Sequence, residues 1–161
     1  MNTAHLHLLV NHLPVLGVLF GVLLLAWAVF RRSPQLTRAA LGVFVLAGIA
    51  GLVAYLTGEP AEEAVERLSG VSETLIGQHE DAALAATFGA GLLGLLALAG
   101  LVAFRRLADL PRWFTGASLA FGLVATGMMA WTANLGGQIR HSEIRAGAVA
   151  AMDAGSHLDD D

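Results

Sequence analysis

The sequence predicts an all-α protein, a four-helix transmembrane bundle in which the helices run up-down-up-down. Hydrophobic residues make up 56% of the 161 residues and charged residues only 14%, and the mean hydropathy is +0.67. These values exceed what a soluble domain of this size carries. The apolar residues also fall into four long runs separated by short polar segments. Each run has the roughly 20 residues needed to cross about 30 Å of hydrocarbon.

We expect the first span at about residues 6–30 and the second at about 39–58. Pro14 falls in the first turns of the first span, where a lost hydrogen bond costs least. Gly17 and Gly21 form a GxxxG motif in the same span, which lets another helix approach closely.

A short helix is expected at about residues 60–69, where Pro60 suits a first turn and the charged residues lie away from Val65 and Leu68. We expect this helix to lie at the membrane surface. The third span, at about 73–104, starts after Ser72, which suits an N-cap.

The fourth span is expected at about 113–142, and the membrane domain as a whole at 1–145. The remaining residues, 146–161, end in three aspartates. They predict an acidic, weakly ordered tail on the same side of the membrane as the N-terminus.

Arginine, the only basic residue of the chain, is concentrated in the two short loops of the bundle. By the positive-inside rule both loops face the cytoplasm, and both termini then face outward. Every acidic residue except Asp109 lies on that outer side, as do all six histidines. The loop arginines are Arg31, Arg32 and Arg38 in the first loop and Arg105, Arg106 and Arg112 in the second.

The chain has no cysteine, which excludes disulfides, thiolate metal sites, iron–sulfur clusters and covalently attached c-type haem. HExxH, GxSxG and phosphate-binding signatures are also absent. These absences favour an electron carrier or an accessory subunit over an enzyme. We assign no catalytic residue and expect no nucleic-acid partner.

Histidines are expected to converge at one edge of the bundle, because the outer ends of all four helices meet there. His7 and His12 lie at the start of the first span, His79 about two turns into the third, and His141 at the end of the fourth. A single histidine at such a position is adequately explained by hydration. Ionisable residues in three different spans are costly, however, and tend to be functional.

The last span continues into a polar stripe formed by Asn134, Gln138, His141 and Arg145, which are spaced i, i+4, i+7 and i+11. We therefore predict that His12, His79 and His141 share a site. His7, Glu59 and Gln138 are predicted to surround it or to act as alternative ligands.

Four segments carry a family resemblance: HLLVNHLP from His7, TGEP from Thr57, His79-Glu80, and LGGQIRHSEI from Leu135. With these segments the chain resembles a widespread bacterial family of small four-helix inner-membrane proteins of unknown function. The resemblance implies an inner-membrane location, in which the outward-facing termini predicted from the arginines would be periplasmic. The family's proposed relation to di-haem b-type cytochromes is a reason to favour haem. One departure is that the chain after His141 reads SEIR where the family has a Gly/Val run.

Haem b and a bare metal ion predict different ligands. A b-type haem needs two axial histidines on different helices and cations for its propionates. We expect the axial pair among His7, His12, His79 and His141, and the cations to be Arg140 and Arg145, with Arg67 as an alternative. A divalent transition metal ion would instead use carboxylates together with histidines. Its expected ligands are His12, His79, His141, Glu59 and Glu80.

Two hypotheses for the function follow. In the first, the protein binds haem b in the membrane and passes electrons to a periplasmic electron-transfer protein. In the second, it is a non-catalytic or metal-binding accessory subunit of a larger membrane complex. The lipid bilayer is a partner in both.

Overall fold

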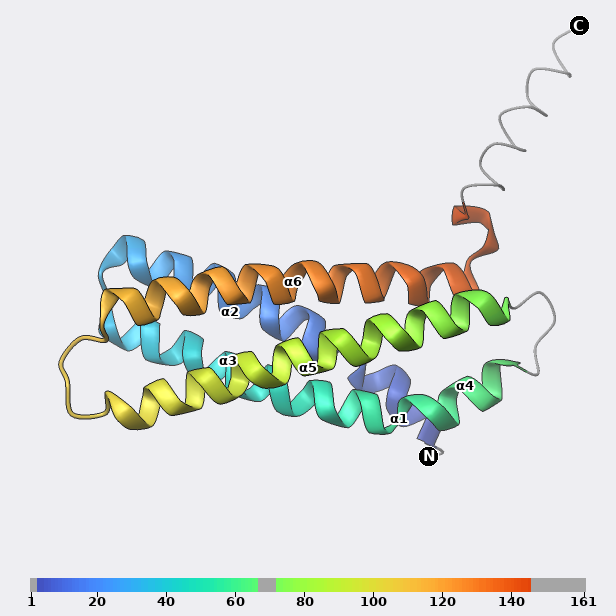
Figure 1. The fold of residues 1–161 in the computed structure, drawn as a ribbon, viewed down its shortest axis with the longest axis horizontal. Helices are drawn as coiled ribbons and strands as arrows, with labels where there is room; N and C mark the ends of the chain where they lie inside the picture. The colour runs from blue at the N-terminus through green and yellow to red at the C-terminus, as the bar shows by residue number, and fades with distance from the viewer. Residues whose placement is uncertain (1–2, 67–71, 146–161) are drawn as a thin grey trace, which may run out of the picture.

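The structure is a computed structural model that describes residues 3–66 and 72–145, and the regular structure within these ranges is entirely helical, as the sequence predicts. Four long helices lie side by side (Figure 1). Each packs against the next in the ring α2–α3–α5–α6, and α6 closes the ring against α2. The long helices are α2 (His12–Arg31), α3 (Pro34–Leu56), α5 (Glu73–Ala103) and α6 (Arg112–Arg140).

The two ends of the bundle differ in what they carry. The α2–α3 and α5–α6 connections lie together at one end, here called the loop end (Figure 1). The opposite end, here called the histidine end, carries α1 (Thr3–Val10), which packs against the short α4 (Gly58–Glu66). The chain therefore alternates in direction along its four long helices, as predicted.

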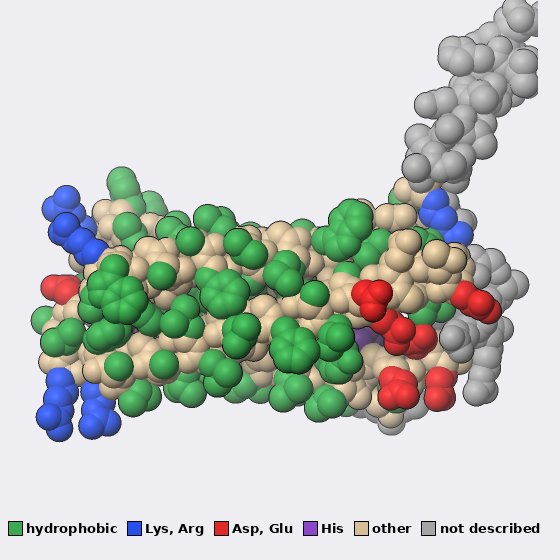
Figure 2. Space-filling model, viewed as in Figure 1, with side chains coloured by type: hydrophobic (Ala, Val, Ile, Leu, Met, Phe, Trp, Pro, Cys, Tyr) green, Lys and Arg blue, Asp and Glu red, His purple; other side chains and the backbone are tan. Residues whose placement is uncertain are grey.

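The outer surface of the bundle is apolar. Four helical segments are long and apolar enough to span a membrane: Thr3–Arg31, Pro34–Leu56, Glu73–Ala103 and Arg112–Ile139. Between a quarter and two fifths of the most apolar stretch of each is buried inside the bundle, so most of its side chains face outward. Figure 2 shows these hydrophobic side chains covering the length of the bundle, with most of the basic side chains at one end and most acidic ones at the other. A multi-pass membrane protein accounts for this surface.

The first span is broken near its start. α1 ends at Val10 and α2 begins at His12. Pro14 explains the position of the break, because proline cannot donate to the carbonyl four residues earlier, that of Val10, and its ring pushes that carbonyl away. Asn11, between the two helices, keeps a helical backbone with φ −62° and ψ −26°, and its N–H donates to the His7 carbonyl oxygen at 2.9 Å. The interruption is therefore local, and α1 and α2 together form the span Thr3–Arg31.

Side-chain caps fix where two other helices begin. The Ser33 hydroxyl accepts from the Leu36 N–H at 3.3 Å at the start of α3, where Pro34 takes the first helical position. The Ser72 hydroxyl accepts from the Leu75 N–H at 3.4 Å at the start of α5, as the sequence predicts. α4 corresponds to the predicted surface helix at 60–69, but residues 67–69 lie outside the described residues, as does the predicted tail at 146–161.

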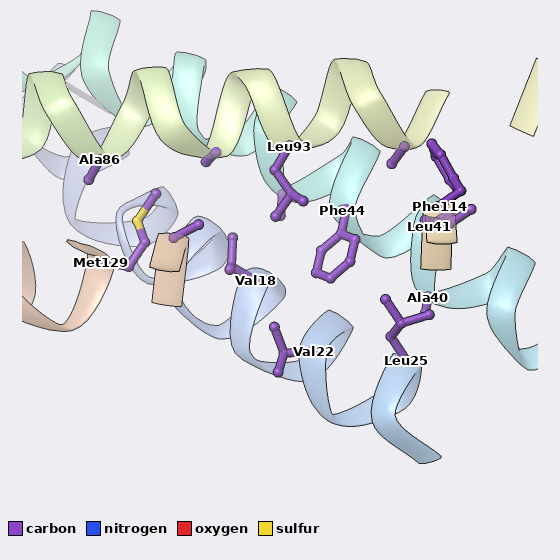
Figure 3. Packing of buried hydrophobic residues seen from close by; sticks show 14 of the residues in the cluster. Val18, Val22, Leu25, Ala40, Leu41, Phe44, Ala86, Leu93, Phe114 and Met129 are labelled. Carbon is purple, nitrogen blue, oxygen red and sulfur yellow. The ribbon is translucent and has the colours of Figure 1, made fainter. Parts of the chain in front are cut away.

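The core is built around Phe44, whose side chain is fully buried at the centre of the bundle (Figure 3). Its ring lies against two glycines of neighbouring helices, because a Cβ at Gly21 would be 2.5 Å from Phe44 Cε1 and one at Gly122 would be 3.1 Å from Cζ. Val18, Leu25 and other apolar side chains complete the cluster.

α3 and α5 cross with their backbones in near contact. A Cβ at Gly48 would come within 2.9 Å of the Ala90 carbonyl oxygen, and one at Gly94 would come within 3.2 Å of the Phe44 carbonyl oxygen. Only glycine permits this approach, which gives close packing in a membrane where burial from lipid adds little. Gly48 and Gly94 therefore have a packing role.

Arg38 ties the two halves of the bundle together at the loop end. Its guanidinium nitrogen Nη2 donates to the carbonyl oxygens of Phe104 at 3.1 Å and Leu107 at 2.8 Å. Phe104 is the C-cap of α5, so Arg38 in the first turns of α3 satisfies carbonyls that the end of α5 leaves open.

Candidate functional site

His7 of α1 is held against the end of α3. Its Nδ1 lies 2.9 Å from the Ala54 carbonyl oxygen and 3.3 Å from the Thr57 hydroxyl. Thr57 is the C-cap of α3 and is itself buried, with its hydroxyl directed to the carbonyls of Val53 and Ala54. The half-buried His7 ring thus joins the start of the first hairpin to its end.

His79 of α5 makes the corresponding contact in the second hairpin. Its Nδ1 lies 3.0 Å from the Thr132 carbonyl oxygen of α6, and the ring is half-buried. A Cβ at Gly136 would be 3.1 Å from His79 Cε1, so the glycine leaves room for the ring to lie close to the α6 backbone.

Both hydrogen bonds fix the tautomer of the ring. A carbonyl oxygen can only accept, so Nδ1 of His7 and Nδ1 of His79 must each carry the proton. A neutral imidazole protonated on Nδ1 presents an unprotonated Nε2 with a free lone pair. This is the arrangement by which proteins orient histidines that ligate metals, with the second nitrogen anchored on a carbonyl.

The two rings lie in the same region of the histidine end. The His7 ring is held on the end of α3, and His79 belongs to α5, which packs against α3. We call His7 and His79, with the carbonyls of Ala54 and Thr132 that hold them, the two-histidine site. The bond of His7 links α1 to α3 within the first hairpin, and the bond of His79 links α5 to α6 within the second.

Asn11 lies one helical turn after His7. Its N–H donates to the His7 carbonyl oxygen at 2.9 Å, so the two side chains share a face of the helix. Its side-chain oxygen is buried and has no hydrogen-bond partner among the described residues. Buried polar atoms normally have a partner, so this oxygen marks the region as suited to a water molecule or a ligand.

The structure does not bring together the three histidines that the sequence analysis grouped. His12 is exposed on the outside of α2, one position after Asn11 on the helix. The His141 side chain is 62% exposed and pairs with Glu143, with Nδ1 and Oε1 2.8 Å apart. The expected set of His12, His79 and His141 therefore corresponds to three separate environments, of which only that of His79 is enclosed.

Carboxylates do not complete a metal site in the part of the chain that the structure describes. No group of three or more His, Asp or Glu side chains that could hold a metal ion occurs in that part. Glu59 and Glu80, expected as metal ligands, are both exposed. They contribute negative charge around the site, and Figure 2 shows a histidine set back among acidic side chains at this end.

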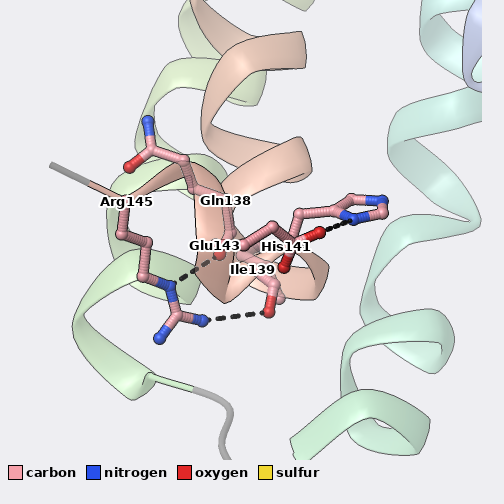
Figure 4. Close-up of polar contacts among 5 residues, drawn as sticks. All are labelled: Gln138, Ile139, His141, Glu143 and Arg145. Atoms are coloured by element: carbon pink, nitrogen blue, oxygen red, sulfur yellow. Dashed lines mark hydrogen bonds and ion pairs between the residues drawn. The ribbon is translucent and has the colours of Figure 1, made fainter. Parts of the chain in front are cut away.

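The polar stripe predicted along the last helix is interrupted, because α6 ends at Arg140 and a 3-10 turn, η1 (Ser142–Ile144), follows. Arg145 folds back on the helix end, with Nε donating to the Gln138 carbonyl oxygen at 2.9 Å and Nη2 to that of Ile139 at 3.2 Å (Figure 4). It therefore caps the last carbonyls of α6. The Gln138 side chain donates to Asn134 Oδ1 at 2.7 Å, which keeps the first step of the stripe.

The residues expected to meet haem propionates are thus placed differently from the prediction. Arg145 has its guanidinium engaged by the carbonyls of α6. The side chain of Arg140 and the whole of Arg67 lie outside the described residues.

In the η1 turn, the pKa of the Glu143 carboxyl is lowered by its own backbone N–H and by the hydrogen bond from His141.

A cavity of about 350 Å³ opens on the surface between α5 and α6 at the histidine end. It is lined by Gln78, Asp81, Ala82, Trp131 and Leu135, so neither ring of the two-histidine site opens into it.

No family model, curated protein or solved structure matches the chain. The fold and the surface nevertheless define the class of protein: an integral membrane protein whose four apolar helices form a multi-pass, all-α bundle.

Proposed function

We propose that the two-histidine site binds b-type haem, which Nε2 of His7 and Nε2 of His79 would hold, and that the protein is an electron carrier. The observation that carries the proposal is the pair of Nδ1–H bonds to the carbonyls of Ala54 and Thr132, at 2.9 and 3.0 Å. These bonds leave the ligating nitrogen of each ring unprotonated on two different helices. That is the donor set which a haem between helices requires.

The number of donors favours haem over a bare metal ion. Protein zinc sites use three or four ligands from the chain, whereas haem supplies four nitrogens of its own and needs two from the protein. The described residues contain no group of three possible metal ligands, but they do contain two oriented histidines. When bound, haem would supply one-electron redox chemistry.

The surrounding chain has features that suit this role. The glycine at 136 lets the His79 ring lie close to α6, and the unpartnered oxygen of Asn11 is a buried acceptor near His7. The guanidinium of Arg145 already caps α6, so we do not propose that it binds a haem propionate.

The location suits exchange of electrons with a water-soluble partner. With the arginine-rich loops in the cytoplasm, the two-histidine site lies at the periplasmic edge of a bacterial inner membrane. A haem there would be within reach of both the bilayer and a periplasmic electron-transfer protein.

The proposal is tested by expressing the full-length protein with sufficient haem and recording reduced-minus-oxidised spectra after purification. We expect a redox-sensitive Soret band that is lost in His7→Ala and in His79→Ala. His12→Ala is the matched control, because His12 lies one helical position from Asn11 but is exposed, and it should leave the spectrum unchanged. Wild-type protein that folds without any Soret band, or single-histidine variants with an unaltered spectrum, would overturn the proposal.

A second function, that of an accessory subunit in a larger membrane complex, is favoured by open glycines on α6. Gly116 and Gly127 are exposed and have no atom within 4 Å of where a Cβ would lie, so they do not serve packing within the described bundle. Small residues on a lipid-facing helix allow another helix to approach. If this function holds, Gly116→Leu should remove co-purifying membrane subunits while the isolated bundle stays folded.

A further inference from the structure

We infer that the loop end binds anionic phospholipid headgroups, with one arginine pair on each hairpin loop holding the headgroup phosphate. The pairs are Arg31 with Arg32 and Arg105 with Arg106. This inference concerns the end of the bundle opposite the two-histidine site and does not depend on haem binding.

The arginines of both pairs have no ionic partner within the part of the chain that the structure describes. Each side chain is exposed, and none of the four guanidinium groups makes a hydrogen bond or ion pair there. The one acidic residue of the loops, Asp109, is exposed as well. Figure 2 shows the basic side chains gathered in two groups on opposite sides of the loop end. Positive charge at both places is therefore available to an external anion.

Arg38 differs from the arginines of the two pairs in having hydrogen-bond acceptors within the protein. Its guanidinium is used inside the protein, by the carbonyls of Phe104 and Leu107. Arg31 and Arg32 lie only a few residues earlier in the chain, and their guanidinium groups have no such acceptor among the described residues. The difference separates a structural arginine from arginines directed to the surroundings.

Aromatic side chains place the first pair at the depth of lipid headgroups. The Arg31 guanidinium carbon lies 5.8 Å from the centre of the Trp27 ring, and Trp27 is 53% exposed. Tryptophan favours the boundary between hydrocarbon and headgroups. The second pair has Trp113, 70% exposed, close to it through the contact of Trp113 with Phe104.

The chemistry of the pair fits a phosphate diester. Guanidinium groups bind phosphate oxygens through two parallel hydrogen bonds, which an ammonium group cannot do. Arg32 adopts φ 49°, the left-handed conformation in which a helix end usually carries glycine. An arginine at that position presents a side chain where glycine would present none. A bilayer lipid with a negative headgroup, such as phosphatidylglycerol, is the occupant to which these features point.

Tryptophan fluorescence gives a test with an internal control, because Trp131 is 61% exposed at the histidine end. Three full-length variants, each keeping one tryptophan and carrying Phe at the other two positions, are reconstituted into bilayers. Quenching by brominated phosphatidylglycerol is compared with quenching by brominated phosphatidylcholine. We expect phosphatidylglycerol to be preferred by at least about threefold at Trp27 and at Trp113. We expect no preference at Trp131, which lines a cavity with Asp81.

Substitutions then assign each preference to its pair. Arg31→Gln with Arg32→Gln should abolish the preference at Trp27 and keep it at Trp113, and Arg105→Gln with Arg106→Gln should do the reverse. Lysine at the same positions should retain part of the preference, and added salt should weaken it in the unsubstituted loops. Equal quenching by both lipids at Trp27 and Trp113, or a preference of the same size at Trp131, would overturn the inference.

Discussion

Replacing Gly21 by alanine should destabilise the bundle through a clash with one residue, Phe44. The added Cβ would lie 2.5 Å from Phe44 Cε1 and 2.6 Å from Cδ1. The Phe44 ring is fully buried and cannot move out of the way. Overpacking of this kind costs about 1–3 kcal/mol. The helix propensity of alanine over glycine offsets up to about 1 kcal/mol of that cost.

Removing the ring should reverse the sign of the effect. In a bilayer the separated helices remain in an apolar medium, so Phe44→Ala loses mainly packing. A cavity of roughly 100 Å³ at about 24 cal/mol per Å³ gives roughly 2 kcal/mol of destabilisation. In that background the methyl group of Gly21→Ala enters the vacated space, and the second substitution should be neutral or stabilising.

The assay is a double-mutant cycle of unfolding free energies measured in mixed micelles with increasing denaturing detergent. We expect a coupling energy of about 1–3 kcal/mol between the two substitutions. Gly42→Ala is the matched control, since no atom lies within 4 Å of its Cβ position, and it should behave alike in both backgrounds. Additive effects of Gly21→Ala and Phe44→Ala would refute the packing described here.

Three other predictions follow from polar contacts and topology. Arg38→Gln should lower the unfolding free energy by about 1.5–3 kcal/mol, because two carbonyls at the end of α5 lose a charged donor, whereas Arg31→Gln should change it by less than about 0.5 kcal/mol. The Glu143 carboxyl should titrate below the unperturbed value of about 4.3 in carbon NMR. Its stabilisation of the turn should be present above that value and should be lost as the pH falls through the lowered pKa. His141→Ala should raise this pKa only in part, since the backbone N–H of Glu143 remains. Reporter fusions at the C-terminus should be active in the periplasm and inactive in the cytoplasm.

Much of the fold could be predicted because it depends on length and composition. Four runs of apolar residues require four spanning helices, and short connections require neighbouring helices to be antiparallel. The caps at Ser33 and Ser72 follow from local chemistry at the start of a helix. The interruption after Val10 also has a local cause in Pro14. It was not predicted, because proline is expected to be tolerated in the first turns of a helix.

The candidate site was less predictable because it depends on which face of each helix is buried. His12 and His7 both lie near the start of the first span, but only His7 shares a face with Asn11, the buried Pro14 and the fully buried Val18. These positions are spaced by four, three and four residues, which is the signature of one helix face. Following this spacing back from the core would have selected His7 over His12.

The end of the last helix could not be predicted from periodicity. The spacing of Gln138, His141 and Arg145 fits a continuing helix, yet Arg145 folds back onto the carbonyls of α6 and the chain turns at His141. A side chain that folds back to cap its own helix does not lie on the helix face that its spacing in the sequence predicts. Such tertiary contacts are decided by geometry after the helix has formed.

The orientation of the two histidines is the central claim, and nitrogen NMR of ¹⁵N-histidine-labelled protein in bilayers tests it most directly. The assignments come from His7→Ala and His79→Ala. The structure predicts that in ligand-free protein the neutral form of each ring carries its proton on Nδ1 and leaves Nε2 bare, because the carbonyls of Ala54 and Thr132 accept from Nδ1. A proton on Nε2 with Nδ1 bare, in either ring, would contradict it.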